Sequence, residues 1–314
     1  MTSPNTTIQR RELGEIASEY ALVESQRKFI GLKLMPIFNT ALQSGNYTNI
    51  PIEEMLKPRK TKRAPRGAYN RGNWEFEQPS YATQEYGWEE VVDDSDARNY
   101  RSYFDAEQLS TRLATDVILR DQEERIADVV EGLTANNVSV KWSEASTATP
   151  RADVQAGIKS IMNATGEMPD TLQITWQTFQ YLLITDEVTN NVKYTNPITM
   201  MGFEAQKQAL ATYLGVSKIE VGNAIKNGAD EGATFSASQL WTDSRGCLLV
   251  TAQGDFDTKP AFGRSMLWTG DSPTNVVIET YREEQVRGEI VRARQNLDEL
   301  VLNTTAAYSF GNLA

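Results

Sequence analysis

DAEQLSTRLATDVILRDQEERIADVVEGL, residues 105–133, carries the longest helical pattern of the chain and sets the scale of its fold. Asp105 is a candidate N-cap, and Gln108 stands at the third helical position, as in a capping box. Asp116–Arg120 and Asp121–Arg125 place acid before base four residues apart, which is the stabilising order. The helix is expected to be roughly 43 Å long at about 1.5 Å per residue. Its apolar residues keep helical spacing: Leu109, Leu113, Val117, Ile126, Val129, Val130 and Leu133.

Within this helix the stretch RDQEER, residues 120–125, is charged all round. A helix segment with no apolar face does not pack into a core. This part of the rod is therefore predicted to be exposed or to face another subunit.

The segment before the helix, residues 43–92, is predicted to be extended. Aromatic and β-branched residues with Gly and Pro punctuation lie on both sides of a central basic run. A hairpin with arms of about 20 residues would reach roughly 65 Å, at about 3.3 Å per residue. Neither arm has the apolar content of a core, and a two-stranded ribbon is marginal alone in water. The ribbon is therefore expected to be ordered only by lying on a neighbour.

The basic run KPRKTKRAPRGAYNRG, residues 57–72, contrasts with the charge of the whole chain. The net charge is −11, and it is −18 without the seven basic side chains of the run. Eight acidic residues follow between Glu75 and Asp96. A body this acidic repels DNA over most of its surface. The basic residues are Lys57, Arg59, Lys60, Lys62, Arg63, Arg66 and Arg71.

Four interpretations of the basic run compete. The residues fit a nuclear-localisation signal, but nothing else in the chain supports that function. A DNA grip needs stacking aromatics or a basic groove, and only Tyr69 and Trp74 lie near. A solvated charged tip is the simplest alternative. We favour an electrostatic contact between subunits, because the same chain supplies abundant acidic surface for a neighbour's loop.

The favoured interpretation names both halves of such a contact. Trp74 is expected to anchor the interface beside the seven basic residues, since aromatic side chains are typical of interface anchors. Exposed ion pairs contribute only about 0–1 kcal/mol each, so the run would steer and register assembly more than it would stabilise it. The candidate acidic partners are Glu89, Glu90, Asp93, Asp94, Asp121, Glu123 and Glu124.

The remaining chain divides into an N-terminal part and an α+β part. Residues 1–30 are predicted to form an arm lying on another surface, and FIGLKLMPIF (29–38) a buried short strand or extended segment. The linker SEASTATPRAD is the best boundary candidate, near Thr149–Pro150. Beyond it, helical patterns alternate with the strand patterns TLQIT and KIEVG, and after residue 234 strands dominate.

Several classes of function are disfavoured by absent residues. The chain has no histidine, so Ser-His and Cys-His pairs and histidine-ligated zinc are excluded. The single Cys247, within the apolar run CLLV, is predicted to be a buried, inert thiol. Phosphate-loop, nucleophile-elbow and dinucleotide-binding motifs are missing, and Asp93, Asp94 and Asp96 lack the Gly and Glu of a calcium loop. We therefore expect no enzyme activity, catalytic residue, cofactor or metal, and no apolar run is long enough for a membrane helix.

The order of these elements resembles the major capsid proteins of tailed bacteriophages, which have the Hong Kong ninety-seven fold. FIGLKLMPIF followed by QSGNYTNIP is similar to the entry into that family's extended loop, and RAPRGAYNRGNWEF and EYGWEEV to its tip and return. The helix 105–130 resembles the spine helix of the peripheral domain. GEMPDTLQITWQTFQYLL resembles a unit of the axial domain, and KPAFGRSMLW with the last strands resembles the closing of the peripheral domain.

The resemblance implies an α+β fold divided into domains and a function in self-assembly. Hexamers and pentamers would form an icosahedral shell enclosing double-stranded DNA without sequence-specific contact, in the virion and assembled in the host cytoplasm. The partners implied are other copies, a portal, decoration proteins and, because the arm is short, a separate scaffolding protein; no membrane is implied.

Some relatives cross-link a loop lysine, and Lys57, Lys60 and Lys62 lie in the matching loop, without an identified asparagine partner. The implied boundaries are an arm at 1–35, an extended loop at 36–98, the peripheral domain at 99–150 and 256–314, and the axial domain at 151–255.

Two alternatives to a phage capsid stay open at this level. An encapsulin-type shell holding cargo enzymes would have the same fold. A nucleic-acid-binding module using residues 57–71, or a carboxylate-based hydrolase, would belong to a different class.

Overall fold

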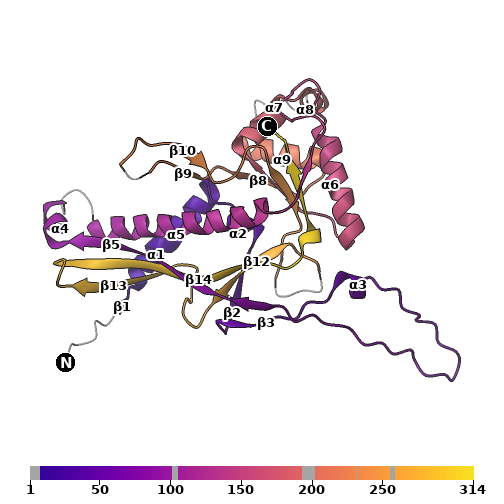
Figure 1. Ribbon diagram of the computed structural model, residues 1–314, viewed down its shortest axis with the longest axis horizontal. Helices are drawn as coiled ribbons and strands as arrows, with labels where there is room; N and C mark the ends of the chain where they lie inside the picture. Colours follow the sequence, from indigo (N-terminus) through magenta and orange to yellow (C-terminus); the bar gives the residue numbers. More distant parts are fainter. Residues whose placement is uncertain (1–7, 101–104, 193–201, 231, 255–258) are drawn as a thin grey trace.

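The computed structural model describes residues 8–100, 105–192, 202–230, 232–254 and 259–314. Figure 1 shows a broad body with one long helix and the largest sheet, a second lobe of helices around a smaller sheet, and a thin loop extending away from both. The chain is α+β, as the sequence predicts.

The largest sheet is organised around β14 (Gly288–Val301), the longest strand described. Along one edge β14 pairs with β5 (Gln84–Asp93), and along the other it pairs first with β13 and then with β12. β1 pairs with β13, and β2 runs parallel to β12. β14 thus joins β5 on one side to β13 and β12 on the other. The outer strands are β13 (Val277–Glu283), β12 (Gly263–Trp268), β1 (Ile8–Gln9) and β2 (Ile37–Thr40).

Two helices cover one face of this sheet. α5 (Ala106–Glu131) packs on β14 and β5, and α1 (Arg11–Arg27) packs on α5. The apolar cluster between them includes Leu13, Ile118, Ile126 and Val291. The short α2 (Gly31–Leu34) follows α1 and also packs on α5, and α4 (Asp94–Tyr100) follows β5.

The second lobe has its own sheet and its own core. The strand order is β6-β15-β11-β7-β8, so the C-terminal strand lies inside the sheet. Trp142, Phe179 and Phe310 are fully buried in its core. The strands are β6 (Ala135–Asn137), β15 (Ala307–Gly311), β11 (Gly246–Leu249), β7 (Thr171–Thr175) and β8 (Lys218–Gly222), and the helices are α6 (Pro150–Thr165), α7 (Trp176–Ile184), α8 (Asp186–Val192) and α9 (Phe203–Leu214). The 3-10 turn Thr304–Ala306 leads into β15, and the hairpin of β9 (Ile225–Asn227) and β10 (Ala237–Gln239) stands apart from this sheet.

The long helix begins as predicted but buries a different face. Asp105 caps it by accepting hydrogen bonds from the backbone N–H groups of Glu107 and Gln108 at 3.1 and 3.4 Å. However, Leu113 is 50% exposed, and Leu109 and Val117 are exposed beside it. Thr111 and Thr115 are buried in their place, because each hydroxyl donates to the carbonyl of the preceding turn. The predicted apolar stripe therefore holds only for the second half of the helix.

The prediction that RDQEER is exposed or faces another subunit is wrong for its centre. Glu123 is 3% exposed, and its carboxylate accepts hydrogen bonds from Ile30 N at 3.0 Å, Gly31 N at 2.7 Å and Trp241 Nε1 at 2.7 Å. Burial raises the pKa of the Glu123 carboxyl, and the three N–H donors oppose that rise. A buried carboxylate is tolerated here because its oxygens are hydrogen-bonded. Glu123 is therefore not a candidate partner for another subunit's loop.

The N-terminal segment also differs from the prediction. Residues 11–27 form α1, whose Leu13 and Ala17 pack into the core of the chain itself. In 29–38, a helical turn (α2) precedes the strand β2, so the predicted extended segment is correct only in its second half. The N-terminal N–H groups of α2 find their acceptor in Glu123, which the local sequence does not reveal.

The predicted ribbon pairs only at its root. β3 (Ser44–Asn46) pairs with β4 (Ser80–Ala82), and one further bridge joins Asn49 to Glu77. Beyond that bridge the outgoing arm turns into α3 (Ile52–Met55), and residues 57–76 form no ladder. Pro51, Pro58 and Pro65 lack the N–H that a ladder requires. The loop is long and projecting, as predicted, but it is not a two-stranded ribbon.

Glu123→Gln is expected to lower the free energy of unfolding by about 2–3 kcal/mol, because an amide cannot accept all three buried hydrogen bonds. Glu124→Gln is the matched control, since the ion pair of Glu124 with Lys226 is partly exposed and should change the stability by at most about 0.5 kcal/mol. Urea unfolding of the unassembled chain measures both. Equal midpoints for the two variants would contradict the role of Glu123.

Candidate functional site

The loop tip, residues 57–74, is the part of the described chain that extends furthest from either core (Figure 1). Ala64 accepts a hydrogen bond from Gly67 N at 3.0 Å, which closes a turn at the end of the loop. Arg66 adopts a positive φ of 66° in this turn. Basic residues therefore lie on both arms that lead to this turn.

Three of the seven basic side chains have partners inside the loop. Lys57 Nζ lies 2.5 Å from a carboxylate oxygen of Glu54, and Arg59 lies 3.0 Å from the other oxygen. Arg63 donates to the carbonyl of Gly67 at 2.5 Å. Glu54 is not among the site residues predicted from the sequence, although its spacing of three residues before Lys57 is a signal for such a pair.

The other four basic side chains define the cationic face of the tip. Each is exposed, and none makes an ion pair with another described residue. Exposed positive charges at this density repel one another unless an anionic surface is near. The tip therefore has a net positive surface that its own chain does not neutralise. These residues are Lys60, Lys62, Arg66 and Arg71.

The aromatic side chains of the tip lie against its own arginines. The guanidinium carbon of Arg59 is 4.4 Å from the ring centroid of Trp74, and that of Arg63 is 4.4 Å from the centroid of Tyr69. Both are cation–π distances. Each ring consequently has one face occupied from within the chain, although Trp74 keeps 47% of its surface exposed.

The acidic candidates lie on the body, and none of them meets the loop tip of the same chain. Glu89 binds Arg292 at 2.6 Å and Asp94 binds Arg282 at 2.7 Å, while Asp121 pairs with Arg125 and Glu124 with Lys226. The hydrogen bond from Arg282 lowers the pKa of the exposed Asp94 carboxyl. Glu90 accepts from Trp88 Nε1, and Asp93 from the backbone N–H of Ser95. All six are at least partly exposed, whereas Glu123 is buried.

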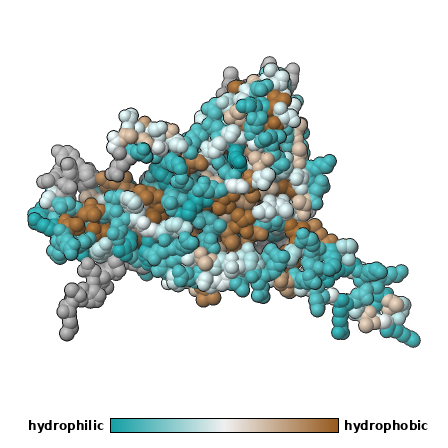
Figure 2. All heavy atoms as spheres, in the orientation of Figure 1, coloured by the Kyte–Doolittle hydropathy of each residue, from teal (hydrophilic) through white to brown (hydrophobic). Residues whose placement is uncertain are grey.

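An exposed apolar stripe lies beside two of these acids on α5. Leu109, Leu113 and Val117 follow one another at four-residue spacing and face away from the sheet. Beyond Val117, Arg120 donates to the carbonyl of Ile225 in the β9–β10 hairpin. Figure 2 shows hydrophobic residues reaching the surface along this part of the body, between hydrophilic ones. The outward face of α5 thus combines an apolar first half with acidic residues further along.

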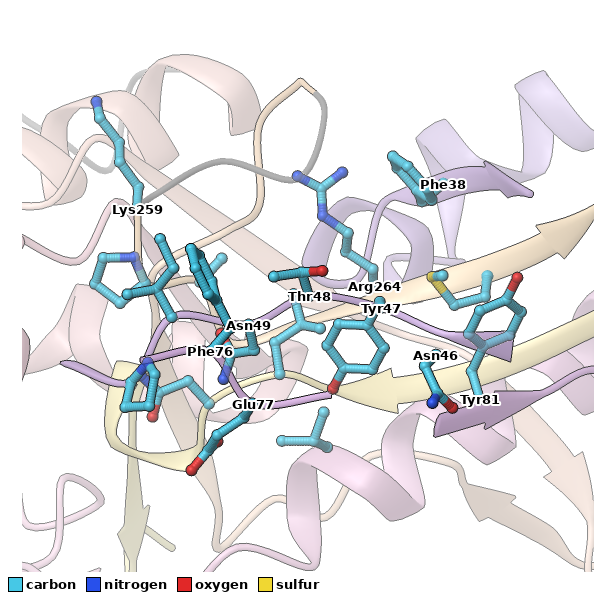
Figure 3. A pocket seen from close by; sticks show the side chains of 18 of the residues that line it. Phe38, Asn46, Tyr47, Thr48, Asn49, Phe76, Glu77, Tyr81, Lys259 and Arg264 are labelled. Carbon is cyan, nitrogen blue, oxygen red and sulfur yellow. The ribbon is translucent and has the colours of Figure 1, made fainter. Parts of the chain in front are cut away.

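A large cleft lies between the root of the loop and the body (Figure 3). It has a volume of about 960 Å³, and its lining includes Tyr47, Phe76 and Glu77 of the loop with Lys259 and Arg264 of the body. Arg264 is anchored by donating to the carbonyl of Gly254 at 2.5 Å. The lining contains neither Cys nor His, so thiolate and imidazole chemistry are excluded there.

Other chemical functions find little support in the described residues. Within those ranges, no group of three or more acidic or thiol side chains is arranged to hold a metal ion. None of the described helices is both long and apolar enough to cross a membrane. Cys247 is buried, as predicted, and burial raises its pKa to about 12. What the geometry offers is a projecting cationic loop and an acidic, partly apolar body.

Comparison with known proteins identifies the fold. No protein-family model matches the sequence, and no curated protein matches it. Among solved structures, a phage-related protein of Bordetella bronchiseptica superposes with a TM-score of 0.72 at 18% identity, over 98% of both chains. The capsid of the myovirus phage XM1 gives a TM-score of 0.56 at 10% identity, over 89% of this chain and 90% of that one. The encapsulin of Synechococcus elongatus gives 0.50 at 10% identity, over 100% and 92%.

These likenesses extend over nearly the whole chain at low sequence identity. These structures define the fold class of this chain, which is a fold found in proteins that form shells. This chain has the fold of the tailed-phage capsid proteins, the Hong Kong ninety-seven fold, as the order of its sequence elements predicts.

Cys247 is expected not to react with a thiol-specific reagent such as Ellman's reagent at pH 8 in the folded chain. A buried thiol with a pKa of about 12 has almost no thiolate at that pH and no access to the reagent. After unfolding in guanidinium chloride, one thiol per chain should react. Rapid labelling of the folded chain would show that Cys247 is accessible and reactive, against this assignment.

Proposed function

We propose that this chain is the major capsid protein of a tailed bacteriophage and that it self-assembles into hexamers and pentamers of an icosahedral shell enclosing double-stranded DNA. The observation that carries the proposal is the full-length likeness, over 98% of both chains at a TM-score of 0.72, to a phage-related protein, together with the capsid of phage XM1. The likeness covers nearly the whole chain and is not confined to one lobe, which supports the proposal.

The loop supports this proposal on physical grounds. Its tip buries almost no apolar surface and carries a cationic face that the chain itself leaves unneutralised. The acidic body of a second copy is the complementary surface that every copy supplies. Copies related by symmetry then meet head to tail, and such contacts close into rings. Complementary charge mainly speeds and registers such an encounter.

The outward face of α5 is the surface that suits a neighbour's loop best. Its apolar residues Leu113 and Val117 match the exposed aromatic side chains Trp74 and Phe76 of the loop. Its acidic residues Asp121 and Glu124 match the cationic face. Burying exposed apolar side chains contributes about 25 cal/mol per Å², which exposed ion pairs alone do not supply.

The division of the chain follows from this function. We assign α5 and the largest sheet to the peripheral domain, and the part of the second lobe that runs from α6 to β11 to the axial domain. The loop serves as the extended loop, and the N-terminal segment as an arm that packs on the body of its own chain. The boundaries proposed are 1–35, 36–98, 99–150, 151–255 and 256–314.

The role is structural, without an enzyme activity or a cofactor. The other partners proposed are a separate scaffolding protein, a portal, decoration proteins, and packaged DNA held without sequence-specific contact. The proposed location is the virion, after assembly in the host cytoplasm. An acidic body suits a shell that encloses DNA, because it repels the DNA and does not bind it.

An encapsulin-type shell with cargo enzymes is a second candidate. The likeness to the Synechococcus elongatus encapsulin, over 100% of this chain, favours it. The content of native particles separates the two candidates: double-stranded DNA supports the capsid, and packaged protein without DNA supports the encapsulin-type shell.

A nucleic-acid-binding module fits the geometry less well. Trp74 and Tyr69 each have one ring face covered by an arginine of the same loop, which removes a stacking surface for bases. A strongly salt-dependent affinity of the unassembled chain for DNA would favour the module nonetheless.

Replacing Lys60, Lys62 and Arg63 with Glu together is expected to reduce shell formation at least about tenfold, since it turns the attraction of the tip for an acidic surface into repulsion. Far-ultraviolet circular dichroism of the unassembled chain should stay unchanged, because all three side chains are exposed. Sedimentation and electron microscopy measure assembly, of the chain alone or with its scaffolding protein.

A single pair of variants controls for charge. Lys62→Glu and Lys159→Glu change the net charge equally, and Lys159 is exposed on α6. Only Lys62→Glu should slow assembly. Normal shells from the triple variant would rule out the loop as an intersubunit contact.

A further inference from the structure

The base of the loop tip is held by side chains and not by a backbone ladder. The last bridge between the two arms is Asn49 with Glu77, and no ladder joins the described arms beyond it. Glu54 lies just past this point in α3, on the outgoing arm. It is 8% exposed, the most buried residue of its short helix, although it is a carboxylate in a projecting loop.

Glu54 is buried because two cations surround it. Lys57 and Arg59 each take one of its oxygens, at 2.5 and 3.0 Å. The pairing is bidentate for the carboxylate, so both of its charged oxygens have a donor. Arg59 is thereby fixed at a definite place between the two arms.

Arg59 continues from Glu54 to the returning arm. Its guanidinium donates to the carbonyl of Asn73 at 3.4 and 3.5 Å and lies over the ring of Trp74 at 4.4 Å. The contact crosses fifteen positions of sequence between Arg59 and Trp74. One side chain therefore joins both arms, at a level where the backbone does not.

Gly72 lies beside the guanidinium of Arg59 on the returning arm. A Cβ built on Gly72 would lie 2.3 Å from Arg59 Nη1, closer than atoms approach. A side chain at residue 72 would therefore displace the flexible end of the Arg59 side chain from this position. Gly72 does not have a positive φ, so its backbone conformation alone does not require glycine.

Within the closed tip, two further hydrogen bonds fix the turn. Asn70 Nδ2 donates to the carbonyl of Lys60 at 2.7 Å, across the two arms, and Arg63 Nε donates to that of Gly67 at 2.5 Å. Arg59 and Gly72, the chain neighbours of Lys60 and Arg71, lie close to each other. The arrangement of the cationic face therefore depends on the contacts of Arg59 together with these two hydrogen bonds.

We propose that Glu54, Arg59, Gly72 and Trp74 form a clasp that closes the loop tip in the free chain and presents Lys60, Lys62, Arg66 and Arg71 as one preformed surface for an acidic face of a second copy. Glu54 and Arg59 are positioning residues in this scheme, and the four lysines and arginines make the contact. The second half of the proposal rests on the proposed function. A tip ordered in advance loses less conformational entropy when it docks, which favours association.

The clasp is tested first on the unassembled full-length chain, by the rate of trypsin cleavage after Lys60 and Lys62. Glu54→Gln keeps every cleavage site but removes the charge that holds Arg59. Gly72→Ala keeps every charge but moves the flexible end of Arg59 out of its place. Both variants should be cleaved about five- to tenfold faster than the unchanged chain at low salt, because an open tip fits the protease better.

Glu53→Gln is the matched control, since Glu53 is the exposed neighbour of Glu54 and makes no ion pair with another described residue. Its cleavage rate should equal that of the unchanged chain. Raising the salt concentration should speed cleavage of the unchanged chain and leave Glu54→Gln nearly unaffected, because only an ionic clasp is screened. Equal rates for Glu54→Gln and Glu53→Gln at low salt would overturn the clasp.

Assembly kinetics then separate the clasp from the proposed function. If the clasp positions the contact, Glu54→Gln and Gly72→Ala should assemble about five- to tenfold more slowly, while Glu53→Gln assembles at the normal rate. Faster proteolysis with normal assembly would overturn the positioning role and leave the capsid function intact. If the unchanged chain never assembles, the proposed function fails, whatever the proteolysis shows of the clasp.

Discussion

The buried carboxylate of Glu123 is the contact on which the larger body of this fold depends. It joins three segments that are far apart in sequence: the start of α2, the middle of α5 and Trp241 on the way into β11. Breaking one partner of such a group leaves a buried charge with missing hydrogen bonds, which is strongly destabilising. The N-terminal segment, the long helix and the chain that enters the second lobe therefore hold their positions together.

The loop is ordered by a different kind of interaction from the body. Where the body uses apolar burial, the loop has almost none, and its order comes from charge-assisted and cation–π contacts such as Glu54–Arg59–Trp74. These contacts are local, and the side chains that surround the buried Glu54 are exposed, so the contacts shape the tip without adding much to the stability of the chain. A rigid body with a shaped, charged extension is what a repeating assembly requires, because the extension meets another body in a fixed geometry.

How much of this the sequence predicts varies with the range of the interactions. Asp105 and the spacing of Ile126 and Val130 fix the start and the buried second half of α5, since capping and periodicity are local. The burial of Thr111 and Thr115 in place of Leu109 and Leu113 is not predictable from hydropathy, because the threonine hydroxyls bind their own helix. The order of elements along the chain was enough to predict the fold.

How well the sequence predicts the candidate site also depends on the range of the interactions. The basic run and its place in a projecting loop follow from sequence, and the role of Glu54 was detectable from its spacing to Lys57. The burial of Glu123 depends on partners about ninety or more residues away in sequence, which no local pattern reveals. The missing ladder follows from Pro51, Pro58 and Pro65, whose effect the alternation of aromatic and β-branched residues concealed.

The most direct test of the account is a cryo-electron-microscopy reconstruction of particles formed by the unchanged chain, with its scaffolding protein if one is needed. The account predicts closed shells in which residues 57–74 of each copy lie on the acidic body of another copy, at the outward face of α5. Shells whose loop tips end in solvent, or a chain that stays monomeric under every condition tried, would contradict it.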